Sequence, residues 1–188
     1  MLQQQCFESD GFKLVPIRLQ DRYAIMKWRN EQMYHLRQQQ PLTQAMQDKY
    51  FQEVIQELFD QDKPDQILFS FLENDQCIGY GGLVHINWVD RNAELSFIMD
   101  TALEEKRFDE IWSAYLCLIE RAAFEELHLH KVYTYAFDLR PNLYSLLEKN
   151  SFFQDARLNE HVMFNGKYVD VIIHSKINPN ERHCSVPT

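Results

Sequence analysis

The sequence has little cysteine, little glycine and no long apolar run. It holds four cysteines and five glycines in 188 residues, and the cysteines lie far apart without a CxxC pair. Scattered cysteines predict reduced thiols in a cytoplasmic protein and argue against a zinc site or any other metal centre. No apolar run reaches the ~18 residues of a membrane span, and the N-terminus lacks a signal-peptide pattern. We therefore expect no membrane partner.

Positive charge is also scarce. The formal net charge is −9, and nucleic-acid binding needs a basic surface that displaces counterions. We therefore expect no nucleic-acid partner. Hydrophobic residues make up 45% of the chain and aromatic residues 13%, which predicts an ordered core. The length predicts a single domain over residues 1–188, with its core at 12–177 and a loose tail at 178–188, where two prolines fall in eleven residues.

Hydrophobic periodicity predicts alternating strands and helices. We expect strands at 12–19, 67–73 and 131–137, and helices at 20–30, 43–59 and 108–127. Thr43 is a candidate N-cap, and Pro141 suits the first turn of a helix that ends at Asn150. Asn165-Gly166 predicts a closing hairpin over 152–177. The order indicates an α/β fold with a single mixed, mostly antiparallel sheet and flanking helices.

The stretch Cys77–Asp100 combines three glycines with residues that favour strands. A polar turn at Asp90-Arg91-Asn92 divides it into two strands of a hairpin. Glycines inside a strand pattern mark a bulge, or a point where another backbone or a ligand comes close. The polar segment 100–107 then connects this hairpin to the long helix expected from residue 108.

Several motifs in sequence order resemble the GCN5-related N-acetyltransferases, the GNAT family. The resemblance spans 12–177 and rests on IGYGGL (78–83), RNAELSF (91–97) and LEKNSF (147–152). The segment 159–171 (NEHVMFNGKYVDV) is similar to the branch that acetylates the N-termini of ribosomal proteins. Trp28-Arg29-Asn30 is similar to the branch that acetylates nucleotide-linked amino sugars.

The resemblance implies that acetyl-CoA lies where the central strands 93–99 and 131–137 splay apart. Its pyrophosphate would rest on backbone N–H groups at the start of the following helix. Three departures from the family pattern stand out: residues 104–110 contain no glycine, Arg140 or Asn142 stands for an asparagine, and Leu147 stands for the usual acid tyrosine. The cofactor contacts implied are Phe97, Ile98, Met99, Lys106, Arg107, Phe108, Asp109 and Asn142.

Acetylation of an amine needs a base that removes a proton. The resemblance places Glu94 in that role; the alternative is a strand carboxylate that faces solvent or pairs with Arg91. Tyr144 or Tyr135 could replace the missing acid tyrosine, although aromatic residues at such spacing usually belong to a core. The acceptor site would be walled by Trp28, Arg29, Arg37 and His85, unless these residues only pack or face solvent.

Together the residues and the resemblance predict a cytoplasmic, acetyl-CoA-dependent N-acetyltransferase. It would act by direct transfer on a primary amine of a small metabolite, with a nucleotide-linked amino sugar as the first choice. The alternatives are a protein N-terminal acetyltransferase, a non-catalytic GNAT-fold binding protein with a degenerate pyrophosphate loop, and a scaffold in which the closing hairpin forms a homodimer.

Overall fold

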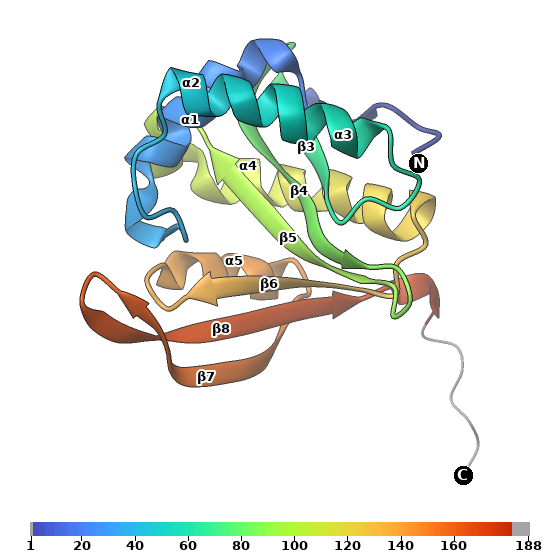
Figure 1. The fold of residues 1–188 in the computed structure, drawn as a ribbon. Helices are drawn as coiled ribbons and strands as arrows, with labels where there is room; N and C mark the ends of the chain where they lie inside the picture. Colours follow the sequence, from blue (N-terminus) through green and yellow to red (C-terminus); the bar gives the residue numbers. More distant parts are fainter. Residues whose placement is uncertain (1, 182–188) are drawn as a thin grey trace.

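The chain forms one eight-stranded mixed sheet in the order β1-β2-β3-β4-β5-β6-β8-β7 (Figure 1). The computed structural model describes residues 2–181. Every strand pair is antiparallel except β5 with β6, which confirms the expected fold class. The strands are β1 (Phe7–Ser9), β2 (Phe12–Pro16), β3 (Ile67–Glu73), β4 (Gln76–Asn87), β5 (Asn92–Met99), β6 (Lys131–Phe137), β7 (Phe153–Phe164) and β8 (Lys167–Ile177).

Helices cover both faces of the sheet (Figure 1). A large core lies between the strands and helices α4 and α5, and includes Phe97, Trp112 and Leu143. A smaller core lies on the α1–α3 side and includes Trp28 and Ile98. The α-helices are α1 (Arg22–Glu31), α2 (Gln44–Lys49), α3 (Gln56–Phe59), α4 (Thr101–Glu120) and α5 (Pro141–Lys149); the shorter turns are Leu19–Asp21, Met33–His35 and Pro179–Glu181, with π-type turns at Tyr50–Ile55 and Arg121–Glu126.

Local sequence signals place several boundaries correctly. The Thr43 hydroxyl accepts a hydrogen bond from Met46 N at 3.3 Å, as an N-cap does. The turn at Asn165-Gly166 joins β7 to β8 with both residues at positive φ, which matches the hairpin signal. The first strand ends at Pro16, three residues before the predicted end, and β1 was not predicted because it has only three residues.

The start of the long helix differs from the prediction. Helix α4 begins at Thr101, where 108 was expected, because the Asp100 carboxylate caps it by accepting from Ala102 N at 3.0 Å. Residues 102–106 (ALEEK) are also strong helix formers, so this segment favours a helix. Arg107 alone has non-helical angles, φ −130° and ψ 19°, which kink the helix at the expected boundary. The polar segment is therefore the first two turns of α4.

The glycines of β4 allow close approach of neighbouring strands. A Cβ atom on Gly81 would lie 2.0 Å from Ser96 O, and one on Gly82 would lie 2.1 Å from Ile67 O. Either contact is far inside the van der Waals limit, so the two positions require glycine. The sequence left open whether a bulge, another backbone or a ligand explains these glycines. At Gly81 and Gly82 it is the backbone of a neighbouring strand that comes close.

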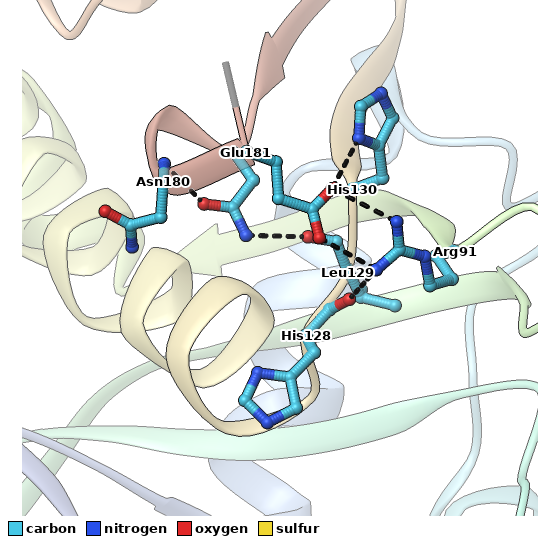
Figure 2. A network of polar contacts seen from close by, with 7 residues as sticks. Arg91, His128, Leu129, His130, Asn180 and Glu181 are labelled. Atoms are coloured by element: carbon cyan, nitrogen blue, oxygen red, sulfur yellow. Dashed lines mark hydrogen bonds and ion pairs between the residues drawn. The ribbon is translucent and has the colours of Figure 1, made fainter. Parts of the chain in front are cut away.

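The first residues of the expected loose tail are held in place (Figure 2). Asn178 Nδ2 donates to Leu129 O at 3.1 Å. The Glu181 carboxylate contacts Arg91 Nη1 at 2.8 Å and His130 Nδ1 at 2.7 Å. The prediction of a loose tail is therefore wrong for 178–181, because these side chains find polar partners at the ends of β5 and β6. Residues 182–188 lie outside the described residues.

Over residues 2–181, no helix is both long enough and apolar enough to cross a bilayer.

Candidate active site

Strands β5 and β6 pair for only three residues and then separate (Figure 1). The paired positions end at Glu94 opposite Tyr133. Beyond them a cavity of about 120 Å³ opens between the two strands. This splay cavity, as we call it below, is lined by His35, Leu36, Arg37, Leu95, Ser96, Phe97, Trp112, Thr134, Tyr135, Ala136, Phe137, Arg140 and Leu143. The splayed strands predicted from the sequence are thus present.

Glu94 lies where the strands begin to separate. Only 11% of its side chain is exposed, and Oε1 accepts a hydrogen bond from Arg37 Nη2 at 2.6 Å. Burial raises the pKa of the Glu94 carboxyl above its ordinary value, while Arg37 and His85 oppose that shift. Glu94 is therefore a buried carboxylate with one strong cationic partner. Both alternatives are wrong, because Glu94 does not face solvent and Arg91 pairs with Glu181.

Arg37 joins the two splayed strands. Besides Glu94 on β5, its guanidinium lies 4.4 Å from the ring centroid of Tyr135 on β6. Arg37 belongs to the segment Met33–Gln39, which we call the strap; it follows α1 and reaches across the sheet. The side chain of Arg37 is 46% exposed, so solvent and other cations can compete with it for Glu94.

A bulge in β4 brings His85 close to Glu94. The β4–β5 register shifts between Val84 and Asn87, and His85 has φ +51°, a left-handed value that is uncommon outside glycine. His85 Nε2 lies 3.8 Å from Glu94 Oε2, with 63% of its side chain exposed. His85 is thus a mostly exposed neighbour of Glu94, and its place in the acceptor site stays a prediction.

The α4–α5 rim of the splay cavity is closed by an ion pair. Arg140, the residue before α5, contacts the Glu104 carboxylate on α4, and its Nη1 donates to His35 Nε2 at 3.2 Å. Burial and the nearby Arg140 lower the pKa of His35 to about 3, so its ring is neutral and can accept this bond. The Arg140 guanidinium also lies 5.2 Å from the Phe108 ring centroid. Of the predicted cofactor contacts on α4, Phe108 is the one at this rim.

The predicted phosphate contacts Lys106 and Arg107 do not line the splay cavity. Lys106 is exposed. Arg107 binds Glu73 of β3 through Nη1 and Nη2, at 2.8 and 2.7 Å, and Glu110 at 2.6 Å. These contacts direct it toward β3 and away from β6. Arg140 is instead the basic side chain at the rim of the cavity.

The other predicted cofactor contacts are distributed over the fold. Asp109 forms an exposed ion pair with Lys149, and Asn142 is exposed in the first turn of α5. Ile98 and Met99 are buried in the two cores, on opposite faces of β5. Phe97 is buried too and lines the splay cavity. Among these residues, the structure brings only Phe97 directly to the splay cavity.

Two predicted acceptor residues take other positions. Trp28 is 3% exposed and packs in the α1–α3 core, so the prediction that it walls an acceptor site is wrong; an apolar helix position buries it. Arg29 Nη1 donates to Tyr80 Oη at 2.7 Å and its Nε to Gln38 Oε1 at 3.0 Å. Arg29 thus supports the strap and does not reach Glu94.

Tyr144 does not line the splay cavity. Its ring stacks on His174 with centroids 5.3 Å apart, and its hydroxyl donates to Asp138 Oδ1 at 3.1 Å. Burial and Asp138 raise its pKa further above the ordinary value of a phenol, which makes it a weaker acid. Tyr135, the other tyrosine considered from the sequence, does line the cavity.

Sequence reasoning missed several lining residues, among them His35, Trp112 and Thr134. Trp112 falls in the helix expected at 108–127, Thr134 in the strand expected at 131–137, and His35 between two expected helices. No spacing marks such residues, because the separation of β5 from β6 creates the space between them.

A second hollow lies beside the splay cavity. This groove of about 490 Å³, the hairpin groove, runs between the strap and the tip of the β7–β8 hairpin and shares three residues with the splay cavity. Its lining residues are Met33, Tyr34, Leu36, Arg37, Gln38, Gln39, Phe137, Val162, Met163, Phe164 and Asn165. The splay cavity therefore has access from the hairpin side, whereas the Arg140–Glu104 pair closes its α4–α5 rim.

Comparison with known proteins identifies the class. The sequence model of the family described as "Acetyltransferase (GNAT) domain" matches residues 14–173. The chain is also 30% identical over 123 residues to the spermidine N(1)-acetyltransferase of Vibrio cholerae serotype O1, covering 62% of this chain and 68% of that protein.

Solved structures show the same fold. The spermidine N-acetyltransferase from Vibrio cholerae in complex with CoA and spermine superposes with a TM-score of 0.78 at 21% identity, covering 90% of this chain and 97% of that one. A structure described as a probable acetyltransferase gives 0.74 at 19% identity, covering 93% and 98%.

The chain belongs to the GNAT acetyltransferase family. It is accordingly an N-acetyltransferase, and its acetyl donor is acetyl-CoA. The residues present fit the acyl arm of that donor, because β5 and β6 separate beyond Glu94 and leave a cavity with apolar walls. The start of α4 differs from the family pattern given above, since Asp100 caps the helix and residues 104–110 contain no glycine.

Proposed function

We propose that this protein acetylates a primary amine of a small molecule by direct transfer, with Glu94 as the general base. The observation that supports this most strongly is the position of Glu94, a buried carboxylate at the last paired residue before β5 and β6 separate. Acetyl-CoA supplies a thioester carbonyl that an amine nitrogen attacks while the thiolate leaves. Glu94 accepts the proton that the amine must lose, and its raised pKa brings it nearer to working pH.

Arg37 and His85 set the charge at this position. Arg37 favours the ionised carboxylate, which is the form that can accept a proton. An ammonium group that approaches Glu94 competes with the guanidinium, since both are cations at the same carboxylate. Arg37 is partly exposed and can swing toward solvent when the acceptor enters. The acceptor therefore exchanges one ion pair at Glu94 for another.

The hairpin groove favours an acceptor whose body is neutral or anionic. Among the residues that line it in the described part of the chain there is no carboxylate, and Arg37 is its only charged residue. A polycation needs carboxylates along its length, whereas phosphate groups pair well with arginine. This composition supports the nucleotide-linked amino sugar predicted from the sequence.

A polyamine is the second candidate. The relative that is 30% identical is named a spermidine acetyltransferase, and a net charge of −9 attracts polycations at long range. The lining of the hairpin groove and the relative thus favour different acceptors, and a direct comparison decides between them.

Thiol release from acetyl-CoA should be measured with a nucleotide-linked amino sugar, with spermidine and with a short peptide that has a free N-terminus. We expect the highest kcat/KM for the amino sugar. A higher value for spermidine would overturn that acceptor and support the polyamine. A protein that binds CoA but releases no thiol with any acceptor would contradict catalysis and favour a binding protein.

A further inference from the structure

Two buried polar side chains in the wall of the splay cavity lack hydrogen-bond partners. Trp112 Nε1 and Thr134 Oγ1 are shielded from solvent and have no partner among residues 2–181. Each residue is 4% exposed, and both line the splay cavity. Trp112 comes from α4 and Thr134 from β6, so they belong to different walls of one space.

Such groups are uncommon in folded proteins. Most buried donors and acceptors are paired, and a buried group left without a partner lowers stability. Helix α4 shows the usual solution one turn further on at Tyr115, whose hydroxyl donates to Ser96 O at 2.8 Å. Elsewhere, Trp88 Nε1 donates to Pro64 O at 2.8 Å. Trp112 and Thr134 therefore differ from equivalent groups in the same chain, and they do so at the cavity.

His174 also has unpartnered ring nitrogens, but it belongs to a different place. Its ring stacks on Tyr144, and it does not line the cavity. It sits opposite Thr134 in the β6–β8 register. Directly opposed residues of an antiparallel pair share one face of the sheet, so His174 is a packing residue beside Thr134.

The chemistry of the cavity indicates what would satisfy the pair. The indole N–H can only donate, whereas a threonine hydroxyl can donate and accept. Around them lie apolar side chains, among them Leu95, Phe97 and Leu143. A ligand that fits is a slender chain, largely apolar, with amide groups at intervals. The pantetheine arm of an acyl-CoA has this character.

We propose that Trp112 and Thr134 bind the amide groups of the pantetheine arm through their side chains, Trp112 as a donor to an amide carbonyl and Thr134 through its hydroxyl. The proposal rests on the use of acetyl-CoA by this chain. It gives both unpartnered polar atoms of the cavity wall a partner on the same ligand.

Thr134→Val provides the sharper test, because it removes the hydroxyl and keeps the shape. The affinities for CoA and for pantetheine, measured by calorimetry, should both fall roughly 3- to 10-fold, the effect of one hydrogen bond. The Tm of the ligand-free protein should rise or stay unchanged, because an unpaired buried group has been removed. A role in packing alone would move the Tm down and leave both affinities unchanged.

Matched controls are available in the same chain. Thr43→Val removes a hydroxyl that caps α2, and it should lower the Tm without changing CoA affinity. Trp112→Phe should weaken CoA and pantetheine binding, whereas Trp88→Phe removes an indole N–H that already has a partner and should leave both unchanged.

Unchanged CoA affinity in Thr134→Val and Trp112→Phe would overturn the proposal, and so would a wild type that binds neither CoA nor pantetheine. Because binding is measured without an acceptor, the result is independent of catalysis. If the two variants weaken CoA binding as expected but the wild type transfers no acetyl group, the proposed function is contradicted and this inference still holds.

Discussion

The two faces of the split between β5 and β6 handle their polar groups in opposite ways. On the face toward the strap, the Glu94 carboxylate binds Arg37, and Arg37 also covers Tyr135. On the face toward α4, Trp112 Nε1 and Thr134 Oγ1 have no partner in the described chain. The first face is complete by itself and must break a contact before it binds a cation. The second face gains contacts when a ligand enters.

This difference suits the two partners of an acyl transfer. A cationic amine can replace Arg37 at little net change in charge, so weak and reversible binding is expected there. A donor arm that satisfies buried polar groups meets no internal competitor and is held more firmly. Variants that remove one group at a time from each face test this difference.

The largest effect is expected at Glu94. Glu94→Gln keeps the shape but cannot accept the proton, so kcat should fall on the order of 10²- to 10⁴-fold in the thiol-release assay. Stability should not fall. Burial raises the pKa of Glu94 in the folded state, so any stability it contributes is lost as pH rises through that pKa, and little remains at neutral pH.

Glu73→Gln is the matched control, because Glu73 is also an arginine-bound carboxylate but lies on β3. It should leave kcat unchanged. Full activity in Glu94→Gln would contradict the assignment of the base and direct attention to His85.

The next effect is a shift in pH dependence on removal of Arg37. Arg37 opposes the burial that raises the pKa of Glu94, so Arg37→Met should raise that pKa further. The acidic limb of the kcat/KM profile should then move up by about 1 to 3 pH units. The rate at pH 6 would fall more than the rate at pH 8.

Arg29→Met serves as the control for this profile. Arg29 contacts Tyr80 and Gln38, so the variant can change KM but should leave the acidic limb in place. If the acidic limb of the kcat/KM profile also stays in place in Arg37→Met, Arg37 does not set the pKa of the base. The described difference between the two faces would then be wrong.

A smaller effect is expected at the α4–α5 rim. Arg140→Gln should weaken CoA binding about 10-fold, the order of a lost charge-assisted hydrogen bond, and should reduce its salt dependence. Pantetheine binding should not change, because pantetheine lacks the nucleotide phosphates. Glu104→Gln should tighten CoA binding, since it frees Arg140 from its carboxylate partner.

Arg107→Gln distinguishes this rim from the basic pair predicted on α4. Arg107 binds Glu73 and Glu110, so we expect a lower Tm and unchanged CoA affinity. Weaker CoA binding in Arg107→Gln, with no effect in Arg140→Gln, would return the phosphate contact to the residues predicted from the sequence.

The sequence predicted backbone features well and side-chain partnerships poorly. The Asn165-Gly166 hairpin and the Thr43 cap depend on neighbouring residues, and local chemistry was enough to place them. The Arg37–Glu94 pair joins residues 57 positions apart, and no periodicity records such a contact. The resemblance placed Glu94 correctly beside the splay, but its partner came only from the structure.

The smallest effect is expected at Tyr144, the acid considered from the sequence. Its hydroxyl donates to Asp138, its ring stacks on His174, and it does not line the splay cavity. Tyr144→Phe should therefore change kcat less than about 2-fold and lower the Tm slightly, since one hydrogen bond of a partly buried group is lost. Tyr135→Phe is the informative partner, because Tyr135 lines the cavity and lies beside Arg37. A larger loss of kcat in Tyr135→Phe than in Tyr144→Phe would indicate that the strap-side face includes Tyr135 on β6. The reverse order would contradict the comparison, because it would place a catalytic group outside the splay cavity, beside Asp138 and His174.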